Sequence, residues 1–495
     1  MFGLSKKNFI LDPKIYEIPF YILIEYLSYR DLIRLSKVDP FLKGEIYHKT
    51  KTFTYAIHDR KYADIFLDTF KNVRLELNYE NDNKWYEGNE LAGFRKISSL
   101  RIVENVRDVK FTSMPYDLKI EADSENIGGF IKTKIPTLRS LVIKHNHYLG
   151  DRHFDDLLNL ENLDLRICAV CTRVKPELKT LVSDQGLMRL VNLRSLTVAC
   201  PNVTDNCFSK LTYLTKLDVR GNNNISDRSI ERLTDLVNLS LMYVPNVTDH
   251  GISVLTNLQR LKIVSSPNIS NDGIRHLSNI KCLSLQNTEN ISWGLEYLIN
   301  LEKFSVDDNS SMFKYLSPVY FNKLTDLTLA YCANIDDSVL IELTNLGSLS
   351  IDKNVVLTDD SISRLTNLKK LKLEYVGKIT GNVFKNLGAL EDLYYKTAGR
   401  LYEKDMLHLT NLRSLTLTCQ EYILEKGGSL KSLSGLTYLN MSCGKKYYAG
   451  AYEIFPDLIR YKTPNYPTDV KTKIPSKLIV IVIIIVASIY LAAFL

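Results

Sequence analysis

The stretch LTNLQRLKI, Leu255 to Ile263, recurs through much of the chain. It returns 22 residues later as LSNIKCLSL from Leu277 and occurs 22 residues earlier as LTDLVNLSL from Leu233. The same frame, Leu-x-x-Leu-x-x-Leu-x-Leu, begins again at Leu190, Leu211, Leu298, Phe321, Leu343, Leu365, Leu387, Leu409 and Leu433, and more weakly at Ile135, Leu157 and Phe455. A period near 22 residues predicts a solenoid, in which each repeat buries its apolar side against its neighbours.

The spacing inside one repeat predicts both of its elements. Leu-x-Leu is a short strand with alternate residues inward, and strands of successive repeats pair into a parallel sheet. A second pattern follows each strand, as in ValThrAsp from Val203, IleSerAsp from Ile225, ValThrAsp from Val247 and LeuThrAsp from Leu357. We expect its Ser or Thr to cap a short helix and its Asp to favour the positive helix end.

This template resembles the leucine-rich repeat, in the variant that carries an Ile-Thr-Asp segment, shortened to 22 residues. The resemblance covers roughly residues 94–463, and the frame slips between Leu165 and Leu190, with a partial copy at Leu178 to Ser183. It implies an α/β solenoid with a parallel sheet on the concave face and short helices on the convex face.

Repeats do not explain Ile15 to Tyr47. Pro19 opens an apolar helix with period 3.6, Asp31 can cap a second helix, and Pro40 ends it. A helical module of this size cannot bury its own apolar faces. It must therefore pack on a neighbouring part of the chain or on a partner.

The string IPFYILIEYLSYRDLIRLSKVDPFLKGEI, from Ile18, resembles an F-box. The matching positions are Pro19, Ile22, Leu23, Leu27, Asp31, Leu32, Leu35 and Val38. The sequence departs from the family at Phe20, where an acidic residue is usual, and at Phe41, an aromatic residue one place early. The resemblance implies that these residues bind a Skp-type adaptor of a cullin–RING ubiquitin ligase. The alternative is an ordinary helical cap on the solenoid.

The C-terminal segment Leu478 to Leu495 is apolar and carries no charge. As a helix it spans roughly 27 Å, close to the thickness of a bilayer core. Lys471, Lys473 and Lys477 precede it, and the first residues of the chain hold no secretory signal. We therefore predict a single-pass, tail-anchored membrane protein with the bulk of the chain in the cytoplasm. A buried core helix is the alternative.

These segments give a domain plan. It places an F-box-like module at 15–50, a connecting region or cap at 51–93, repeats at 94–463, a Pro/Lys linker at 464–477 and a transmembrane helix at 478–495. Richness in Asn, Lys, Ile and Tyr makes the chain similar to F-box/leucine-rich-repeat proteins of giant DNA viruses or protists.

Composition and motifs narrow the function. A net charge of +7 without a polybasic run gives no support for nucleic acid as a partner. No phosphate-binding glycine loop, nucleophile elbow or zinc-protease motif occurs, so we expect a non-catalytic protein without a cofactor.

Cys168 and Cys171 form a CxxC with His145, His147 and His153 upstream, a possible zinc site. However, Cys168 is twelfth in its repeat, where leucine-rich repeats bury an Asn or Cys, so we expect no metal. Five sequons, at Asn202, Asn224, Asn246, Asn268 and Asn290, coincide with the turn Asn and capping hydroxyl of the repeat. We expect them to carry no sugar.

The concave face supplies the candidate partner-binding residues. They are Lys216, Asp218, Arg220, Arg260, Lys262, Lys370, Lys372 and Glu374, which lie at or beside the x of Leu-x-Leu. The F-box resemblance implies a substrate receptor that recruits an unknown target protein to a ubiquitin ligase at a membrane surface. The alternative is a membrane-tethered binding scaffold without a ligase.

Overall fold

The computed structural model describes the central part of the chain. The described residues are 138–144, 149–166, 181–292, 295–308, 318–332, 335–396, 400–419 and 432–443, with the backbone of short strands at 52–56, 74–79, 99–102, 117–120, 421–423, 460–462 and 471–472. The chain divides into two compact units, one of residues 1–213 with 476–495 and one of residues 214–475.

In the first unit, successive short strands pair side by side in parallel. The strands are β1 (Thr52–Ala56), β2 (Arg74–Tyr79), β3 (Ser99–Ile102), β4 (Asp117–Ile120), β5 (Ser140–Lys144), β6 (Asn162–Arg166) and β7 (Ser195–Val198). Short helices follow some of them, namely η3 (Asp151–His153), α7 (Asp184–Leu187) and η4 (Asp205–Ser209).

The second unit holds the most regular repeats. Its parallel strands are β8 (Lys216–Arg220), β9 (Asn238–Met242), β10 (Arg260–Val264), β11 (Cys282–Gln286), β12 (Lys303–Asp307), β13 (Asp326–Ala330), β14 (Ser348–Asp352), β15 (Lys370–Glu374), β16 (Asp392–Lys396), β18 (Ser414–Cys419), β20 (Tyr438–Cys443) and β21 (Arg460–Lys462). The last strand, β22 (Lys471–Thr472), pairs antiparallel with β21. A separate short parallel pair joins β17 (Arg400–Tyr402) to β19 (Glu421–Ile423).

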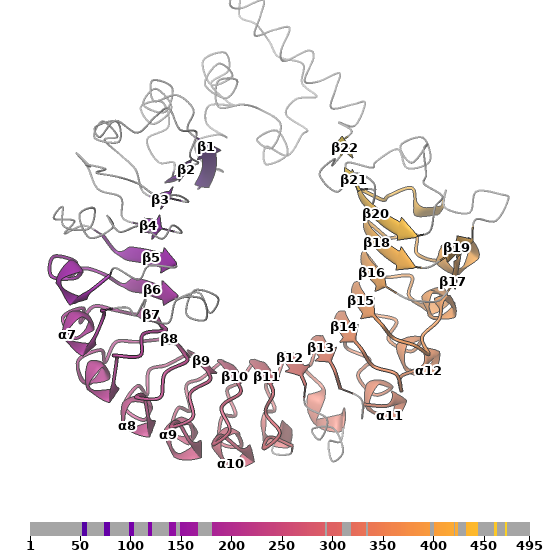
Figure 1. The fold of residues 1–495 in the computed structure, drawn as a ribbon. Coiled ribbons are helices and arrows are strands. Elements are labelled where there is room, and N and C mark those ends of the chain that lie inside the picture. The colour runs from indigo at the N-terminus through magenta and orange to yellow at the C-terminus, as the bar shows by residue number, and fades with distance from the viewer. Residues whose placement is uncertain are drawn as a thin grey trace, which may run out of the picture. The chain divides into compact units, whose positions relative to one another are not determined.

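The helices of this unit lie on the opposite side of each repeat from the sheet (Figure 1). They are α8 (Asp227–Ile230), α9 (Asp249–Ser253), α10 (Asn271–Ile274), η5 (Leu295–Tyr297), η6 (Pro318–Phe321), α11 (Asp337–Leu340), α12 (Asp359–Ile362), η7 (Gly381–Asn386) and η8 (Glu403–Met406). Strands β8–β16 line the inner side of the curve and α8–α12 the outer side, as in the leucine-rich-repeat solenoid. The fold class predicted from the repeat is thus confirmed for the described residues.

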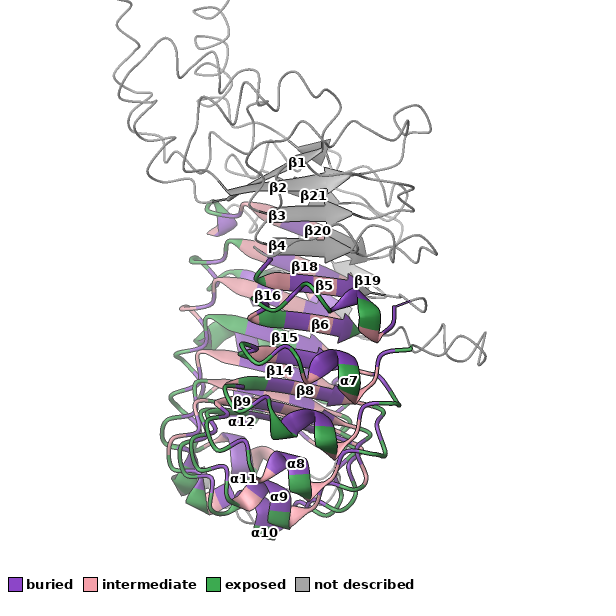
Figure 2. Cartoon of the chain, turned by 90° about the vertical axis from the view of Figure 1, so that its left-hand side faces the viewer, coloured by how far each residue is buried: buried purple, intermediate pink, exposed green. Residues whose placement is uncertain are grey.

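The repeat leucines form the core between sheet and helices. In β10, Leu261 and Ile263 are buried, whereas the alternating Arg260 and Lys262 are exposed. Figure 2 shows the same division in helices α8 and α9, which carry both buried and exposed residues. Each repeat therefore buries one strand face and one helix face, as the Leu-x-Leu spacing predicts.

The helix caps also follow the prediction. The hydroxyl of Thr248 accepts a hydrogen bond from the amide of His250, and Ser226, Ser270, Thr358 and Thr380 cap their helices in the same way. The role of the following Asp was only partly predicted, because its carboxylate also bonds to the next repeat. Asp227 accepts from the Thr248 amide at 2.7 Å and from the Thr248 hydroxyl at 2.7 Å.

This bridge recurs as a ladder along the convex side. The same pair of bonds joins Asp151 to Ser183, Asp184 to Thr204, Asp249 to Ser270, Asp337 to Thr358, and Asp359 to Thr380. Each carboxylate thus fixes the start of the next helix. A second ladder is formed by the Asn of Leu-x-Asn-Leu, since Asn257 and Asn279 each donate to a carbonyl of the preceding repeat.

The slip in the repeat frame is an insertion. Strands β6 and β7 pair Asn162 with Ser195, 33 residues apart, whereas β9 and β10 pair Asn238 with Arg260, 22 residues apart. The extra length lies between β6 and α7, because Val182 is buried and Ser183 caps α7 as in a regular repeat.

Strand pairing begins earlier than the repeats predicted from sequence. Strands β1 and β2, in the range 51–93 predicted as a connecting region or cap, already pair in parallel. Backbone hydrogen bonds between strands need no particular side chain, so strand pairing extends past the repeats whose leucines can be recognised.

Two predicted segments lie outside the described residues: the F-box-like module at 15–50 and the C-terminal segment at 478–495. Within the part of the chain that is described, no helix is both long and apolar enough to cross a membrane.

Candidate binding surface

The candidate surface is the exposed face of the sheet in the second unit. The first and third residues of each strand point away from the core, so neighbouring repeats align these positions into two rows across the sheet. From β8 to β13 the first row reads Lys216, Asn238, Arg260, Cys282, Lys303 and Asp326, and the third-position row reads Asp218, Ser240, Lys262, Ser284, Ser305 and Thr328.

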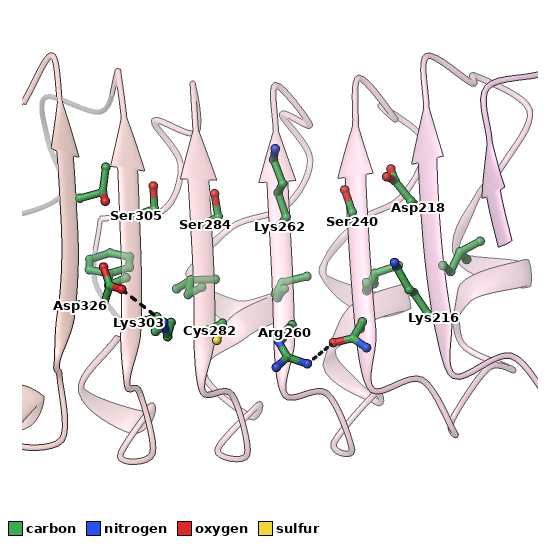
Figure 3. A pocket seen from close by; sticks show the side chains of 17 residues that line it. Lys216, Asp218, Ser240, Arg260, Lys262, Cys282, Ser284, Lys303, Ser305 and Asp326 are labelled. Atoms are coloured by element: carbon green, nitrogen blue, oxygen red, sulfur yellow. Dashed lines mark hydrogen bonds and ion pairs between the residues drawn. The ribbon is translucent and has the colours of Figure 1, made fainter. Parts of the chain in front are cut away.

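These two rows line a shallow depression of about 380 Å³, shown in Figure 3. Its floor is low because four of the third-position side chains are small hydroxyls, while long cationic side chains stand beside them. We call this surface the basic depression. The hydroxyl Oγ of Ser240 is buried there and makes no hydrogen bond to the described residues.

The carboxylates of the basic depression are already engaged. Asp218 accepts two bonds from the guanidinium of Arg220, at 3.0 Å from Nε and 2.6 Å from Nη2. Asp326 pairs with Lys303 at 3.3 Å. By contrast, Lys216 and Lys262 form no ion pair with any described residue, and Arg260 bonds only to the neutral Asn238 amide, at 3.2 Å. The depression therefore presents uncompensated positive charge.

A second charged group lies on β15 and β16. Glu374 pairs with Lys372 at 2.8 Å and with Lys396 at 3.8 Å. The hydrogen bond that Lys372 donates to Glu374 raises the pKa of Lys372 above its ordinary value. The lysines of this group are thus partly neutralised by a carboxylate of their own.

Beside it, just past the strand ends, aromatic and lysine side chains alternate. Lys353 bonds to the Tyr331 hydroxyl and lies 4.1 Å from the centre of that ring, and Lys396 lies 4.5 Å from the centre of the Tyr375 ring. The hydrogen bond to Tyr331 raises the pKa of Lys353. Tyr331, Lys353 and Tyr375 all have left-handed φ angles of 50° to 53°.

The structure divides the predicted partner-binding residues into two sets. Lys216, Asp218, Arg260 and Lys262 line the basic depression, and Arg220 holds Asp218 beside it. Lys370, Lys372 and Glu374 lie on β15, five strands from β10, which is roughly 24 Å at the usual strand spacing. No single small ligand can contact both sets.

Sequence reasoning missed Lys303, Asp326 and Cys282. All three occupy the first strand position, the same place as Lys216 and Arg260, so the repeat frame could have found them. The Tyr331–Lys353–Tyr375 series was also missed, because it lies after the strand, where the frame carries no leucine to mark it.

Most of the CxxC group lies outside the described residues, including Cys168, Cys171, His145 and His147. His153 is described and buried, and its Nδ1 lies 2.8 Å from the Gly150 amide nitrogen. The described residues include no cluster of three or more His, Cys, Asp or Glu side chains that could hold a metal ion.

The other residues in the predicted buried position behave as expected. Cys332 is buried, with its Sγ 3.2 Å from the Ala330 carbonyl. Asn354 is buried and donates to the Cys332 carbonyl at 2.8 Å, while its oxygen accepts from Val356 and Leu357.

No protein-family model matches the sequence, and no curated protein matches it. Among solved structures, an internalin from Listeria monocytogenes is similar, with 24% identity, 62% of this chain and 81% of that chain covered, and a TM-score of 0.41. A Leptospira interrogans leucine-rich-repeat protein shows 17% identity over 74% of this chain and 86% of that chain, with a TM-score of 0.42. Rad7, in its complex with Elc1 from yeast, shows 17% identity over 62% of this chain and 85% of that chain, with a TM-score of 0.39.

Proposed function

We propose that this chain is a substrate-recognition subunit that brings target proteins to a cullin–RING ubiquitin ligase from a membrane surface. In this proposal the F-box-like module at 15–50 binds a Skp-type adaptor, the segment at 478–495 anchors the chain, and the concave sheet takes the target. The observation that carries the recognition role is the basic depression, where Lys216 and Lys262 have no carboxylate partner among the described residues.

A broad sheet face suits recognition of a protein better than catalysis. Its side chains stand on rigid strands held in register by their neighbours, so their positions need little ordering when a partner binds. The F-box resemblance supplies the link to a ligase, and the charge-free terminal segment supplies the link to a membrane.

The ligase role can be tested by adaptor capture. We expect the full chain, immobilised and incubated with host-cell lysate, to retain a Skp-type adaptor and a cullin. Changing Pro19 and Leu23 together to Ala should remove both, since apolar anchors at the centre of an interface dominate its energy. The melting curve of the repeats should stay unchanged, because a solenoid is stabilised by near neighbours only.

The rival proposal is a membrane-tethered binding scaffold without a ligase, favoured by the departures from the F-box pattern at Phe20 and Phe41. It predicts that the wild-type chain retains no adaptor, and that the double change lowers the melting temperature by uncovering the first repeats. That pair of results would overturn the ligase role.

A further inference from the structure

We propose that the basic depression recognises an acidic, extended polypeptide segment whose carboxylates recur every third residue. The inference deepens the proposed function by naming the chemistry of the target segment. It rests on the concave face being the recognition surface but does not depend on the adaptor.

The spacing of the cations carries the inference. Lys216, Arg260 and Lys303 occupy the first position of β8, β10 and β12, which are alternate strands of the parallel sheet. At about 4.8 Å per strand, their backbones are about 9.6 Å apart. A polyproline II segment advances about 3.1 Å per residue with three residues per turn, so its residues i, i+3 and i+6 share one face at about 9.3 Å intervals. The two periods match closely.

The floor suits such a segment. Ser240, Ser284 and Ser305 are short and leave room for backbone between the cationic side chains, as Figure 3 shows. Their hydroxyls can donate to carbonyl or carboxylate oxygens. Ser240 Oγ is buried and makes no hydrogen bond to the described residues, so rotation of this side chain toward the depression lets it donate to an incoming acceptor.

The carboxylates on the surface do not oppose binding. The guanidinium of the half-buried Arg220 pairs with the Asp218 carboxylate and neutralises its charge. Asp326 is held by Lys303, but the Lys303 side chain is exposed and that of Asp326 is partly exposed, and ion pairs open to solvent contribute little. Lys303 can therefore exchange Asp326 for a carboxylate of the incoming segment.

Two other ligand classes fit less well. A single phosphate needs cations that converge on one point, whereas these stand on alternate strands. Single-stranded nucleic acid needs aromatic platforms for its bases, and the only aromatic residue in the lining, Phe304, is buried. The charged group on β15 is also a weaker candidate, because Glu374 already pairs with Lys372 and Lys396.

The test uses the full chain in a mild detergent and two end-blocked, fluorescent peptides of equal composition. One is Glu-Pro-Pro-Glu-Pro-Pro-Glu, with the predicted spacing, and the other is Pro-Pro-Glu-Glu-Glu-Pro-Pro, with clustered charge. We expect the spaced peptide to bind at least about 5-fold more tightly by fluorescence anisotropy, and its affinity to fall as salt rises. Inorganic phosphate and oligo-dT serve as competitors and should displace it only weakly.

Matched variants locate the binding. Changing Lys216 and Arg260 together to Gln should weaken binding of the spaced peptide about 10-fold or more. Changing Lys370 and Lys372 together to Gln, an equal loss of charge on β15 of the same face, should change the affinity of the spaced peptide less than about 2-fold. Melting curves of all variants should coincide with the wild type, because these side chains are exposed.

Cys282 provides a readout inside the surface. It lies between Arg260 and Lys303 in the first row and is half-buried, whereas Cys200, Cys207 and Cys332 are buried. The spaced peptide should lower the rate at which iodoacetamide labels Cys282 at least about 3-fold. Mass spectrometry of the labelled chain measures this rate.

Equal affinity of the two peptides, unchanged labelling of Cys282, or tighter binding of oligo-dT would each overturn the inference. The ligase role fails separately. If the spaced peptide binds but no adaptor is captured, the inference stands and the ligase proposal falls. If an adaptor is captured while neither peptide binds, only the inference falls.

Discussion

At the scale of single residues, the ladder carboxylates leave no room for a side chain at the glycines that stand third in α7, α9 and α10. A Cβ added to Gly273 would lie 2.5 Å from Oδ1 of Asp249 and 2.8 Å from Cδ1 of Ile252. Gly251 and Gly186 meet the ladder carboxylates of Asp227 and Asp151 in the same way. The sequence thus carries glycine where a neighbouring repeat fills the space, although alanine is the better helix former.

We therefore predict that Gly273→Ala lowers the free energy of unfolding by about 1–3 kcal/mol, as overpacking does elsewhere. Urea unfolding followed by circular dichroism measures it. Gly347→Ala is the control, since its Cβ would meet nothing nearer than the Thr325 carbonyl at 3.8 Å, and it should be neutral or slightly stabilising. Equal effects of the two changes would show that steric crowding at Gly273 is not the cause.

At the scale of elements, the same carboxylates join each helix to the next. Asp337, at the start of α11, accepts from the Thr358 amide at 3.0 Å and from the Thr358 hydroxyl at 2.6 Å. Burial pulls the pKa of Asp337 upward, but hydrogen bonds from Ser361 and Thr358 outweigh burial and leave the pKa below its ordinary 3.8. The folded state therefore favours the charged carboxylate.

Since the folded pKa is lowered, the stability that Asp337 contributes is present above pH 3.8 and is lost as pH falls through the folded pKa. At neutral pH, Asp337→Asn should cost about 1–2 kcal/mol, because the amide keeps one acceptor and loses the other. Unfolding curves between pH 7 and pH 3 should show the difference from wild type shrinking as pH falls. Asp235→Asn, at an exposed turn, should differ from wild type at no pH. A cost for Asp337→Asn that does not change with pH would contradict this account.

One repeat of this chain has an amide in place of the ladder carboxylate, and it shows which of the two bonds the carboxylate is needed for. Asn271 stands where other repeats have Asp, and its side-chain oxygen accepts from the Ser292 amide at 2.9 Å. The ladder therefore keeps its backbone bond when the carboxylate becomes an amide. A conservative change at one rung should weaken one junction between repeats rather than unfold the array, because each repeat contacts only its neighbours.

At the scale of the whole molecule, the sequons bear on topology. Asn246 and Asn268 donate their side-chain amides to carbonyls of the preceding repeat, at 2.6 Å and 2.7 Å. The hydroxyls that complete these sequons, Thr248 and Ser270, bond to the ladder carboxylates. Both groups of each sequon are thus engaged in holding repeats together.

We predict that the chain expressed in eukaryotic cells carries no glycan and sediments with membranes, and that deleting residues 478–495 releases it to the soluble fraction. The physical basis is the charge-free terminal segment, which is long enough to span a bilayer core as a helix. Cell fractionation measures membrane association, and the mobility shift after glycosidase treatment measures glycosylation. The control replaces Leu478–Leu495 with a scrambled sequence of equal hydropathy, and this variant should stay in the membrane. Glycosidase-sensitive mass on the full-length chain would refute the cytoplasmic topology.

The period of 22 residues was enough to predict the strands, the buried leucines and the capped helices. Each of these depends on apolar spacing and on hydrogen bonds within a turn or two, which the local sequence encodes. The ladder from Asp227 to Thr248 and the crowding at Gly273 required coordinates, because they join residues about one repeat apart through side-chain geometry.

For the binding surface, too, the sequence predicted only part of what the structure shows. Alternation predicted that Lys216, Lys262 and Lys372 face outward, but not that the first two share a depression while the third pairs with Glu374. Exposed side chains are held by no core, so the sequence alone does not say which charges meet. Lateral alignment of the strands brings together residues many positions apart, and the surface charge that a partner meets depends on that alignment.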